Sequence, residues 1–237
     1  MPLRIVDRPS PNHDSRNGAP VDILVLHYTG MKTAEAALAR LCDPAAKVSA
    51  HYTIDRDGTV YAHVPEGERA WHAGVSYWAG ERNVNARSIG IEIVNPGHEF
   101  GYIPFVDPQI DALIELAHGI LRRHPITPQR VVGHSDVAPA RKQDPGELFP
   151  WQMLAREGIG AWPLPNPLFS LSLSKQGRGQ GEGVFIEDLA RYGYGAAPDV
   201  DVANRDVITA FQRHFRPAKI DGVVDDECAQ LLPGLLA

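Results

Sequence analysis

The chain has 237 residues, of which 43% are hydrophobic, so it is long enough for one large domain or for a medium domain joined to a small one, and too apolar for a disordered protein. Its formal net charge of −6 argues against a protein held on nucleic acid by bulk electrostatics. The N-terminus has no apolar signal segment and no run of about 18 apolar residues follows, which predicts a soluble, cytoplasmic protein without a membrane span.

The first two predicted elements are a strand and a helix. Residues 21–30 form an apolar, β-branched run that ends in glycine, which predicts a buried strand with His27 near its C-terminal end. Residues 32–43 have helical composition, and Thr33 is the candidate N-cap. A histidine at the end of a buried strand is therefore the first candidate for a functional residue.

The next segments are rich in β-forming residues. Residues 49–65 contain two such arms around Asp57-Gly58, which predicts a hairpin. Residues 87–95 alternate apolar and polar side chains before a turn, which predicts a strand with Glu92 pointing away from its isoleucine neighbours. A carboxylate is thus expected on the more polar face of this strand.

A long helix is predicted over residues 107–124, where apolar residues recur at helical spacing, with Asp107 as N-cap and Pro108 at the first helical position. Residues 128–137 follow as a short strand that runs into a loop rich in proline and glycine. Alternating strands and helices predict an α/β domain whose mixed central sheet is flanked by helices.

The composition changes after Trp162. Residues 163–183 are rich in proline, serine, glycine and glutamine, which predicts a linker between a larger domain at 1–162 and a small helical domain at 184–237. Helical periodicity in the last part predicts three helices, near 185–194, 202–215 and 225–232. About 55 residues can just sustain a core of their own.

Two histidines and an aspartate fall near the ends of predicted strands. His27 ends one strand, His134 ends another, and Asp144 lies in the rigid loop that follows. Two imidazoles and a carboxylate can provide three corners of a tetrahedral zinc site, which leaves the fourth corner to water when the site is catalytic. Spacing alone is weak evidence, because histidines and aspartates end many strands, so structural roles for these residues stay open.

Two further charged residues fit hydrolytic chemistry. Beside a zinc-activated water, Glu92 could accept a proton and deliver it to a leaving amine, although a salt bridge with Arg87 or an exposed strand face would also explain it. Lys142 could stabilise an oxyanion as a carbonyl is attacked. On its own, Lys142 would equally be a solvated loop lysine.

Taken together, four segments resemble the zinc-dependent N-acetylmuramoyl-L-alanine amidases of the type-2, AmpD/AmiD-like group. They are ILVLHYTG, VSAHYTIDRDGTVYAHVPEGERAWHAG, RSIGIEIVN and VVGHSDVAPARKQDPG. The resemblance covers about residues 20–162 and is strongest at 133–146. It implies the type-2 amidase fold and hydrolysis of the amide between N-acetylmuramic, or 1,6-anhydro-N-acetylmuramic, acid and L-alanine in muropeptides or peptidoglycan.

The resemblance also implies roles for individual residues. One zinc ion per chain would be held by His27, His134 and Asp144, so that the ligand is Asp144 rather than Asp136. Glu92 would be the catalytic acid and base, and Lys142 would stabilise the tetrahedral intermediate. The intact ligand set argues against the alternative of a non-catalytic peptidoglycan-recognition protein.

Other residues match segments that line the family's substrate groove. These are Tyr28, His51, Trp71, His72, Ala73, Gly74, Arg82 and Asn85. Trp71 would stack on a sugar or peptide face, or else pack in the core. Arg82, Asn85 or Arg87 would meet carboxylates of the stem peptide, and the backbone of the WHAG segment at 71–74 would bind that peptide.

The C-terminal part, with AFQRHF followed by DGVVDDEC, resembles a peptidoglycan-binding three-helix module; a bundle that only stabilises or dimerises the chain is the alternative. A wall-anchored adaptor in which this module does the main work is a further alternative. The expected partners are peptidoglycan fragments or anhydro-muropeptides, and the expected protein is a monomer. Cytoplasmic recycling is the favoured setting, although a wall-binding module points outside the cytoplasm.

Overall fold

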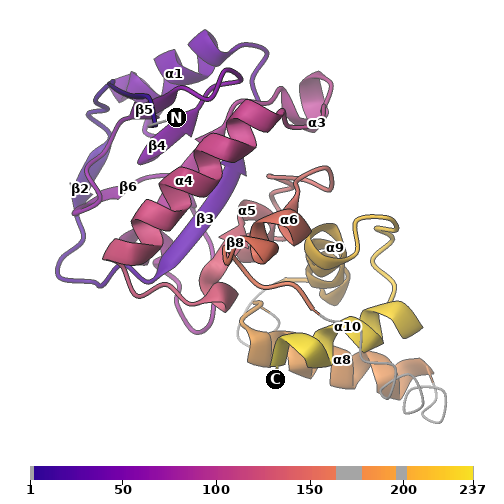
Figure 1. Cartoon of the computed structure of the whole chain (residues 1–237). Helices are drawn as coiled ribbons and strands as arrows, with labels where there is room; N and C mark the ends of the chain where they lie inside the picture. Colours follow the sequence, from indigo (N-terminus) through magenta and orange to yellow (C-terminus); the bar gives the residue numbers. More distant parts are fainter. Residues whose placement is uncertain (1–2, 164–177, 196–201, 237) are drawn as a thin grey trace.

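The computed structural model describes residues 3–163, 178–195 and 202–236. At its centre lies a mixed sheet with helices packed against it (Figure 1). The strand order is β1-β5-β4-β7-β3-β8, and each neighbouring pair is parallel except β4 with β5. The strands are β1 (Ile5–Asp7), β3 (Ile23–Tyr28), β4 (Tyr52–Ile54), β5 (Val60–Ala62), β7 (Ser88–Ile93) and β8 (Val131–Gly133). The predicted α/β fold with a mixed sheet flanked by helices is confirmed.

The remaining elements surround this sheet. The helices are α1 (Ala34–Cys42), α2 (Val84–Arg87), α3 (Gly97–Phe100), α4 (Asp107–Arg123), α5 (His134–Val137), α6 (Trp151–Arg156), α8 (Arg178–Tyr192), α9 (Asn204–Phe215) and α10 (Asp226–Leu236). A small sheet pairs β2 (His13–Ser15) with β6 (Glu68–Ala70). Single 3-10 turns span Pro44–Ala46 and Pro128–Arg130. The predicted N-cap of α1 is confirmed, because the Thr33 hydroxyl accepts a hydrogen bond from the backbone N–H of Ala36 at 3.1 Å.

Alternation along β3 and β7 gives the sheet two different faces. Leu24 and Leu26 of β3 pack into one buried cluster together with the isoleucines of β7 and the apolar side of α4. Successive side chains of a strand point to opposite faces. Residues Ser88, Gly90 and Glu92 of β7 therefore point away from α4. The face opposite α4 thus carries the polar side chains.

The long helix α4 begins one residue earlier than the sequence predicts. Its N-cap is Val106, so Asp107 occupies the first helical position and Pro108 the second. The Gln109 side chain replaces the expected cap, because its carbonyl oxygen accepts from the Val106 N–H at 3.3 Å. Its amide group donates to the backbone oxygen of Val94 at 2.9 Å, which ties the helix start to the end of β7.

The three C-terminal helices share a core with the sheet. One buried cluster joins residues of the sheet and of the preceding loops to residues of α8, α9 and α10. Its members include Ile23, Val25, Trp78, Val84, Val132, Val137, Leu189, Tyr194, Val207, Phe211 and Leu232. The three predicted helices are present, but α8 begins at Arg178, inside the range predicted as linker, and residues 164–177 lie outside the described residues. The C-terminal part therefore does not rely on a core of its own.

A buried carboxylate joins the C-terminal helices to the loop after β8. One oxygen of Asp136 accepts from the Tyr194 hydroxyl at 2.8 Å. The other accepts from Nδ1 of His214 and from the backbone N–H of Gly133, both at 2.7 Å. The His214 ring in turn stacks on Trp151, with 3.8 Å between ring centroids. Asp136 is fully buried, so these hydrogen bonds replace the water that its charge would otherwise need.

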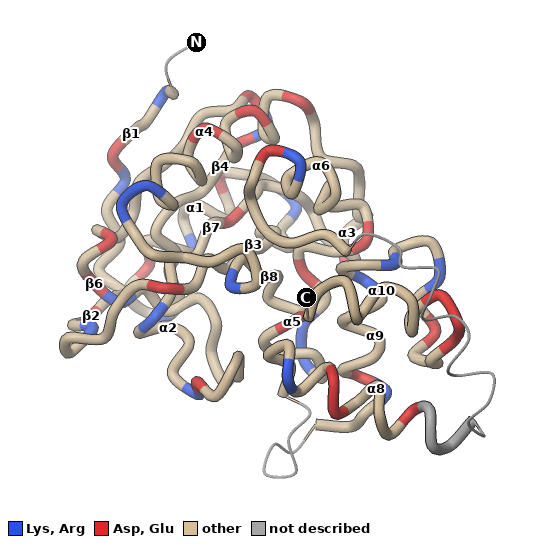
Figure 2. The backbone as a smooth tube through the Cα atoms, turned by 60° about the horizontal axis from the view of Figure 1, so that its bottom comes forward, with Lys and Arg blue, Asp and Glu red and all other residues tan. Residues whose placement is uncertain are grey.

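Charged residues of both signs are distributed over the described chain. Figure 2 shows Lys and Arg beside Asp and Glu on most elements rather than gathered on one basic face. This distribution fits the net charge of −6. Within the described ranges, every helix is too short or too polar to serve as a membrane span.

Glu66 gives the fold a testable dependence on pH. Burial alone would raise the pKa of Glu66, but hydrogen bonds from Arg123, His124 and Tyr52 outweigh it and lower this pKa from 4.5 to about 2. A lowered pKa in the folded state stabilises the protein above pH 4.5, and this stabilisation is lost as the pH falls toward 2. We expect Glu66→Gln to lower the free energy of unfolding by about 1 to 3 kcal/mol at pH 7 and by a smaller amount near pH 3.

Urea unfolding at both pH values measures this difference. Glu115→Gln, on the exposed side of α4, is the matched control and should change little. A destabilisation by Glu66→Gln that stays the same on acidification would contradict the assigned cause.

Candidate metal centre

Two neighbouring strands bring the two predicted histidine ligands together. In the register of β3 and β8, Leu26 lies opposite Gly133. The next residue on each strand is a histidine, so His27 at the end of β3 and His134 at the start of α5 lie at the same level of the sheet. Asp144 reaches them from the loop after α5. The backbone oxygen of Asp144 accepts a hydrogen bond from the N–H of Ser135 at 2.8 Å.

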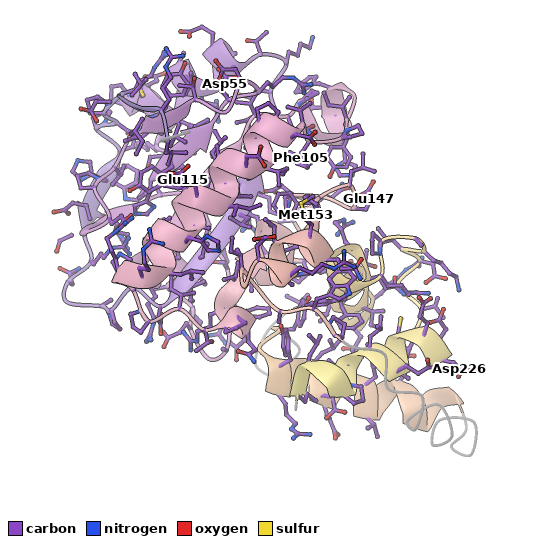
Figure 3. The ribbon with its side chains drawn as sticks, viewed as in Figure 1. Asp55, Phe105, Glu115, Glu147, Met153 and Asp226 are labelled. Carbon is purple, nitrogen blue, oxygen red and sulfur yellow. The ribbon has the colours of Figure 1, made fainter. Side chains whose placement is uncertain are left out.

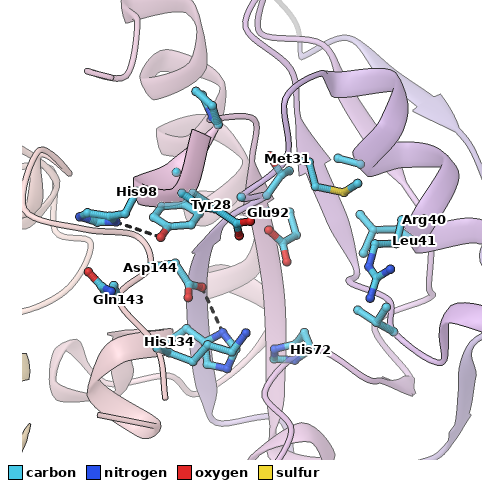
Figure 4. Close-up of a pocket in the computed structure, with 18 of the residues that line it drawn as sticks. Tyr28, Met31, Arg40, Leu41, His72, Glu92, His98, His134, Gln143 and Asp144 are labelled. Carbon is cyan, nitrogen blue, oxygen red and sulfur yellow. Dashed lines mark hydrogen bonds and ion pairs between the residues drawn. The ribbon is translucent and has the colours of Figure 1, made fainter. Parts of the chain in front are cut away.

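The three side chains present their ligand atoms to one point. Nδ1 of His27 and Nδ1 of His134 are 3.0 Å apart, and each lies 3.0 Å from the same oxygen of Asp144. All three residues are at most 6% exposed. A tetrahedral ion with bonds of about 2.0 to 2.2 Å separates its ligand atoms by about 3.3 Å. The triangle therefore fits a small ion such as zinc, and Figure 4 shows His134 and Asp144 meeting at this point.

The electrostatic environment favours the protonation states that a metal ligand needs. Burial lowers the pKa of His27 to about 4, and the neighbouring His134 adds to this, while Asp144 opposes it. Burial alone would raise the pKa of Asp144, but the two histidines hold it well below its ordinary value. A neutral imidazole beside an ionised carboxylate is the combination that binds a divalent cation.

Nδ1 of His134 is available to a metal because its other ring nitrogen is occupied. Nε2 of His134 lies 3.1 Å from the backbone oxygen of Ala73, which can only accept a hydrogen bond. When the ring carries a single proton, that proton is therefore on Nε2, and Nδ1 carries a free lone pair. Arg141 also donates to the Ala73 oxygen, at 3.2 Å, so that this carbonyl is held in place.

Glu92 lies directly across from His27, because the two residues are partners in the parallel register of β3 and β7. Burial raises the pKa of Glu92 well above its ordinary value, the negative charge of Asp144 adds to this, and Lys142 opposes it. Its Oε2 atom is buried without a hydrogen-bond partner among the described residues. A buried carboxylate oxygen without a partner is poised to take up a proton or to bind a ligand.

A cavity of about 550 Å³ opens beside this cluster. His134, Asp144, Glu92 and Lys142 line it, and the buried His27 contacts His134 and Asp144. The structure thus brings together the residues predicted for metal binding and for catalysis. In Figure 4 the carboxylate of Glu92 lies between the histidine cluster and the opposite wall of the cavity.

Tyr28 belongs to a polar cluster on the rim that the sequence did not reveal. Its hydroxyl lies 2.9 Å from Nδ1 of His98, and Nε2 of His98 lies 3.1 Å from the carboxylate of Glu147. Figure 3 labels Glu147 on the loop that leads to α6. The His98 ring stacks on Tyr102, whose hydroxyl donates to the Pro145 oxygen at 2.7 Å. This cluster supports the loop that carries Asp144.

Most of the predicted substrate contacts lie outside the cavity lining. Of the eight residues, Tyr28 and His72 line the cavity. The six predicted residues that do not belong to the cavity lining are His51, Trp71, Ala73, Gly74, Arg82 and Asn85. His51 is fully buried, and its Nδ1 accepts from the Gly90 N–H at 3.0 Å. The oxygen of the Asn85 side chain accepts from the backbone N–H groups of His72 and Ala73, at 3.1 and 2.8 Å.

The arginines of the cavity differ from those predicted to meet the carboxylates of the stem peptide. Arg87 is paired with Asp22 and Glu81, and Arg82 is exposed with its guanidinium 5.7 Å from the centre of the Tyr77 ring. Arg40 of α1 instead lines the cavity, on the wall opposite the histidine cluster in Figure 4. No sequence signal distinguishes Arg40 from an ordinary exposed helix arginine.

A protein-family model matches the first part of the chain. The model of a family described as N-acetylmuramoyl-L-alanine amidase matches residues 17–147. This range contains all three candidate metal ligands as well as Glu92 and Lys142.

Several curated proteins and solved structures are similar to this chain. N-acetylmuramoyl-L-alanine amidase AmiD of Escherichia coli K12 is 42% identical over 230 residues, which are 91% of this chain and 82% of AmiD. 1,6-anhydro-N-acetylmuramyl-L-alanine amidase AmpD of Haemophilus influenzae is 35% identical over 60% of this chain and 86% of AmpD. The structure of E. coli AmiD with the substrate anhydro-N-acetylmuramic acid-L-Ala-D-gamma-Glu-L-Lys is 39% identical, with a TM-score of 0.79 over 94% of this chain and 91% of AmiD. The structure of AMPDH3 from Pseudomonas aeruginosa with an anhydromuramic pentapeptide is 37% identical, with a TM-score of 0.80 over 96% of this chain and 94% of AMPDH3.

Proposed function

The chain belongs to the N-acetylmuramoyl-L-alanine amidase family, and from this premise we propose that it is a zinc amidase that cleaves the bond between muramic acid and the L-alanine of a muropeptide. The observation that carries the proposal is the triangle of three buried ligand atoms, 3.0 Å apart, next to the unpartnered oxygen of Glu92.

His27, His134 and Asp144 would hold one zinc ion per chain. Two nitrogens and one oxygen are a donor set that zinc accepts, and the cavity beside them leaves room for water and substrate. When bound there, zinc would polarise the scissile carbonyl and lower the pKa of a water molecule. The remaining chemistry belongs to side chains of this chain.

Glu92 would act first as base and then as acid. Its free Oε2 would take the proton of the attacking water as the new carbon–oxygen bond forms. The same oxygen would then deliver that proton to the nitrogen of L-alanine as the carbon–nitrogen bond breaks. Lys142, which lines the same cavity, would balance the negative charge that develops on the carbonyl oxygen.

Anhydro-muropeptides are the substrates that we propose first. The name of AmpD and the ligands of the AmiD and AMPDH3 structures all contain an anhydromuramic group. Mass spectrometry of the products from anhydro-muropeptides and from intact sacculi, assayed side by side, tests this preference. Release of free stem peptide from neither substrate would contradict the proposed reaction.

Removal of the carboxylate ligand gives a direct test of the metal site. We expect Asp144→Ala to weaken zinc binding by more than about 100-fold, since contacts outside the ligand set already contribute about 10- to 100-fold. Competition with a chromogenic chelator measures the affinity, and elemental analysis measures the zinc content. Asp107→Ala, at the exposed start of α4, is the control. Unchanged zinc binding in Asp144→Ala would rule out this ligand.

Some properties of the protein stay predictions from its sequence. They are the cytoplasmic location, the monomeric state and the binding of peptidoglycan by the C-terminal helices. Cell fractionation, light scattering and sedimentation with purified sacculi test them in turn.

A further inference from the structure

A chain of hydrogen bonds leads from the candidate metal ligand His27 into the protein interior. Nε2 of His27 lies 3.0 Å from Nδ1 of His72. Nε2 of His72 lies 3.1 Å from the hydroxyl oxygen of Ser88, and that hydroxyl donates to the backbone oxygen of Val84 at 2.7 Å. All four residues are buried.

The far end of this chain fixes the direction of each hydrogen bond. The Val84 oxygen can only accept, so the single hydroxyl proton of Ser88 lies on that bond. The Ser88 oxygen must then accept from Nε2–H of His72.

The direction of the remaining hydrogen bond follows. Among the described residues, the buried ring of His72 is hydrogen-bonded to His27 and Ser88 and to no carboxylate, so nothing there balances the charge of a second ring proton and the ring carries one N–H. Nδ1 of His72 therefore accepts, and the proton of His27 is on Nε2. Nδ1 of His27 is left with a free lone pair.

We propose that His72 is a positioning residue of the metal centre, which together with Ser88 fixes the tautomer and the orientation of the His27 ring so that Nδ1 is offered to zinc. The inference rests on the proposed zinc site and deepens it. The sequence resemblance assigned His72 to substrate contact, whereas its two ring nitrogens are both engaged within the protein.

Two features of the surrounding structure hold His72 in this position. A Cβ atom on Gly90 would lie 2.5 Å from the His72 ring, so the absence of a side chain at this position of β7 makes room for the ring. The side chain of Asn85 accepts from the backbone N–H of His72 at 3.1 Å. The next residue, Ala73, offers its backbone oxygen to His134. Adjacent residues of one loop thus support both histidine ligands.

The tautomer can be observed directly in the zinc-free wild-type protein. Long-range proton–nitrogen spectra distinguish a protonated ring nitrogen from one with a free lone pair. We expect His72 to carry its proton on Nε2 and to keep it there after zinc is added. A proton on Nδ1 of His72 would overturn the proposal, because that nitrogen could then not accept from His27.

Ser88→Ala tests the same series of hydrogen bonds, with zinc affinity as the measured quantity. Without the hydroxyl, the His72 ring has no acceptor for its Nε2–H, so the tautomer of this ring is no longer fixed. We expect the zinc dissociation constant to rise about 10-fold or more, as for other groups that orient a metal ligand. Ser10→Ala is the matched control, because Ser10 is also buried and also donates to a backbone oxygen, that of Leu41, outside this chain.

Substitutions of His72 separate positioning from packing. The amide oxygen of His72→Asn can still accept from Nε2–H of His27, whereas His72→Leu cannot. We expect the asparagine variant to bind zinc more tightly than the leucine variant at comparable Tm. Equal zinc affinity in both variants, or in Ser88→Ala and Ser10→Ala, would overturn the proposal. If the wild-type protein itself binds no zinc, it is the proposed function that fails.

Discussion

Replacing Glu92 with glutamine should lower kcat by about 100- to 10,000-fold and leave the zinc content at one ion per chain, because proton transfer by a positioned carboxylate contributes about that factor. The glutamine side chain has nearly the same shape, but it can neither take a proton from water nor deliver one to the leaving nitrogen. The three ligand atoms are on other residues, so the metal should remain. Turnover of an anhydro-muropeptide and elemental analysis of the same preparation measure the two quantities.

Glu115→Gln serves as the control for this substitution, because Glu115 is exposed on α4. A Glu92→Gln variant that keeps a near-normal kcat would reject the role of acid and base. Loss of zinc from the same variant would instead identify Glu92 as a metal ligand.

The second large effect concerns the core that the C-terminal helices share with the sheet. Phe211 of α9 is fully buried and packs edge-on against Phe185 of α8, with 5.3 Å between ring centroids. It also lies near Tyr194, which in turn contacts Trp78 of the first part of the chain. We expect Phe211→Ala to lower the free energy of unfolding by about 3 to 5 kcal/mol, the usual effect of emptying a buried aromatic site.

The number of unfolding transitions decides whether this core is one unit. Because residues from both parts of the chain belong to it, we expect near-UV circular dichroism and tryptophan fluorescence to report a single transition in urea, shifted as a whole by Phe211→Ala. Val184→Ala, 48% exposed on α8, is the control. Two separate transitions, with only one shifted, would show that the C-terminal helices fold as an independent domain. Truncation before α8 would expose the same core, so loss of activity on truncation carries no information about where the chemistry lies.

The sequence predicted the sheet and its polar face well, for a local physical reason. Alternation along 87–95 is a property of neighbouring residues, and it placed Glu92 on the face opposite the isoleucines, where the structure has it. His27 could be placed at a strand end in the same way. That these two residues face each other follows only from the pairing of β3 with β7, and strand pairing is not a local property.

The parts of the site that depend on contacts between residues far apart in the sequence were harder to predict. The meeting of Asp144 with His27 was implied by the family resemblance and not by spacing, since 117 residues separate them. The roles of Ser88 and Asn85 depend on a loop that returns to the sheet, which no periodicity encodes. Gly90 inside a strand was the one available signal of a close approach, because a strand glycine often marks a point where another group comes near.

The hydrogen bonds of Asp136 limit how this protein can be rebuilt by engineering. Its carboxylate accepts from Tyr194 and His214 of the C-terminal part and lies two residues from His134. A chimaera that exchanges these helices for another targeting module would leave a negative charge in the protein interior without its donors, next to a metal ligand. The C-terminal segment is therefore not an interchangeable cassette: any replacement has to supply a hydroxyl and an imidazole at the same two points, or Asp136 has to be changed along with it.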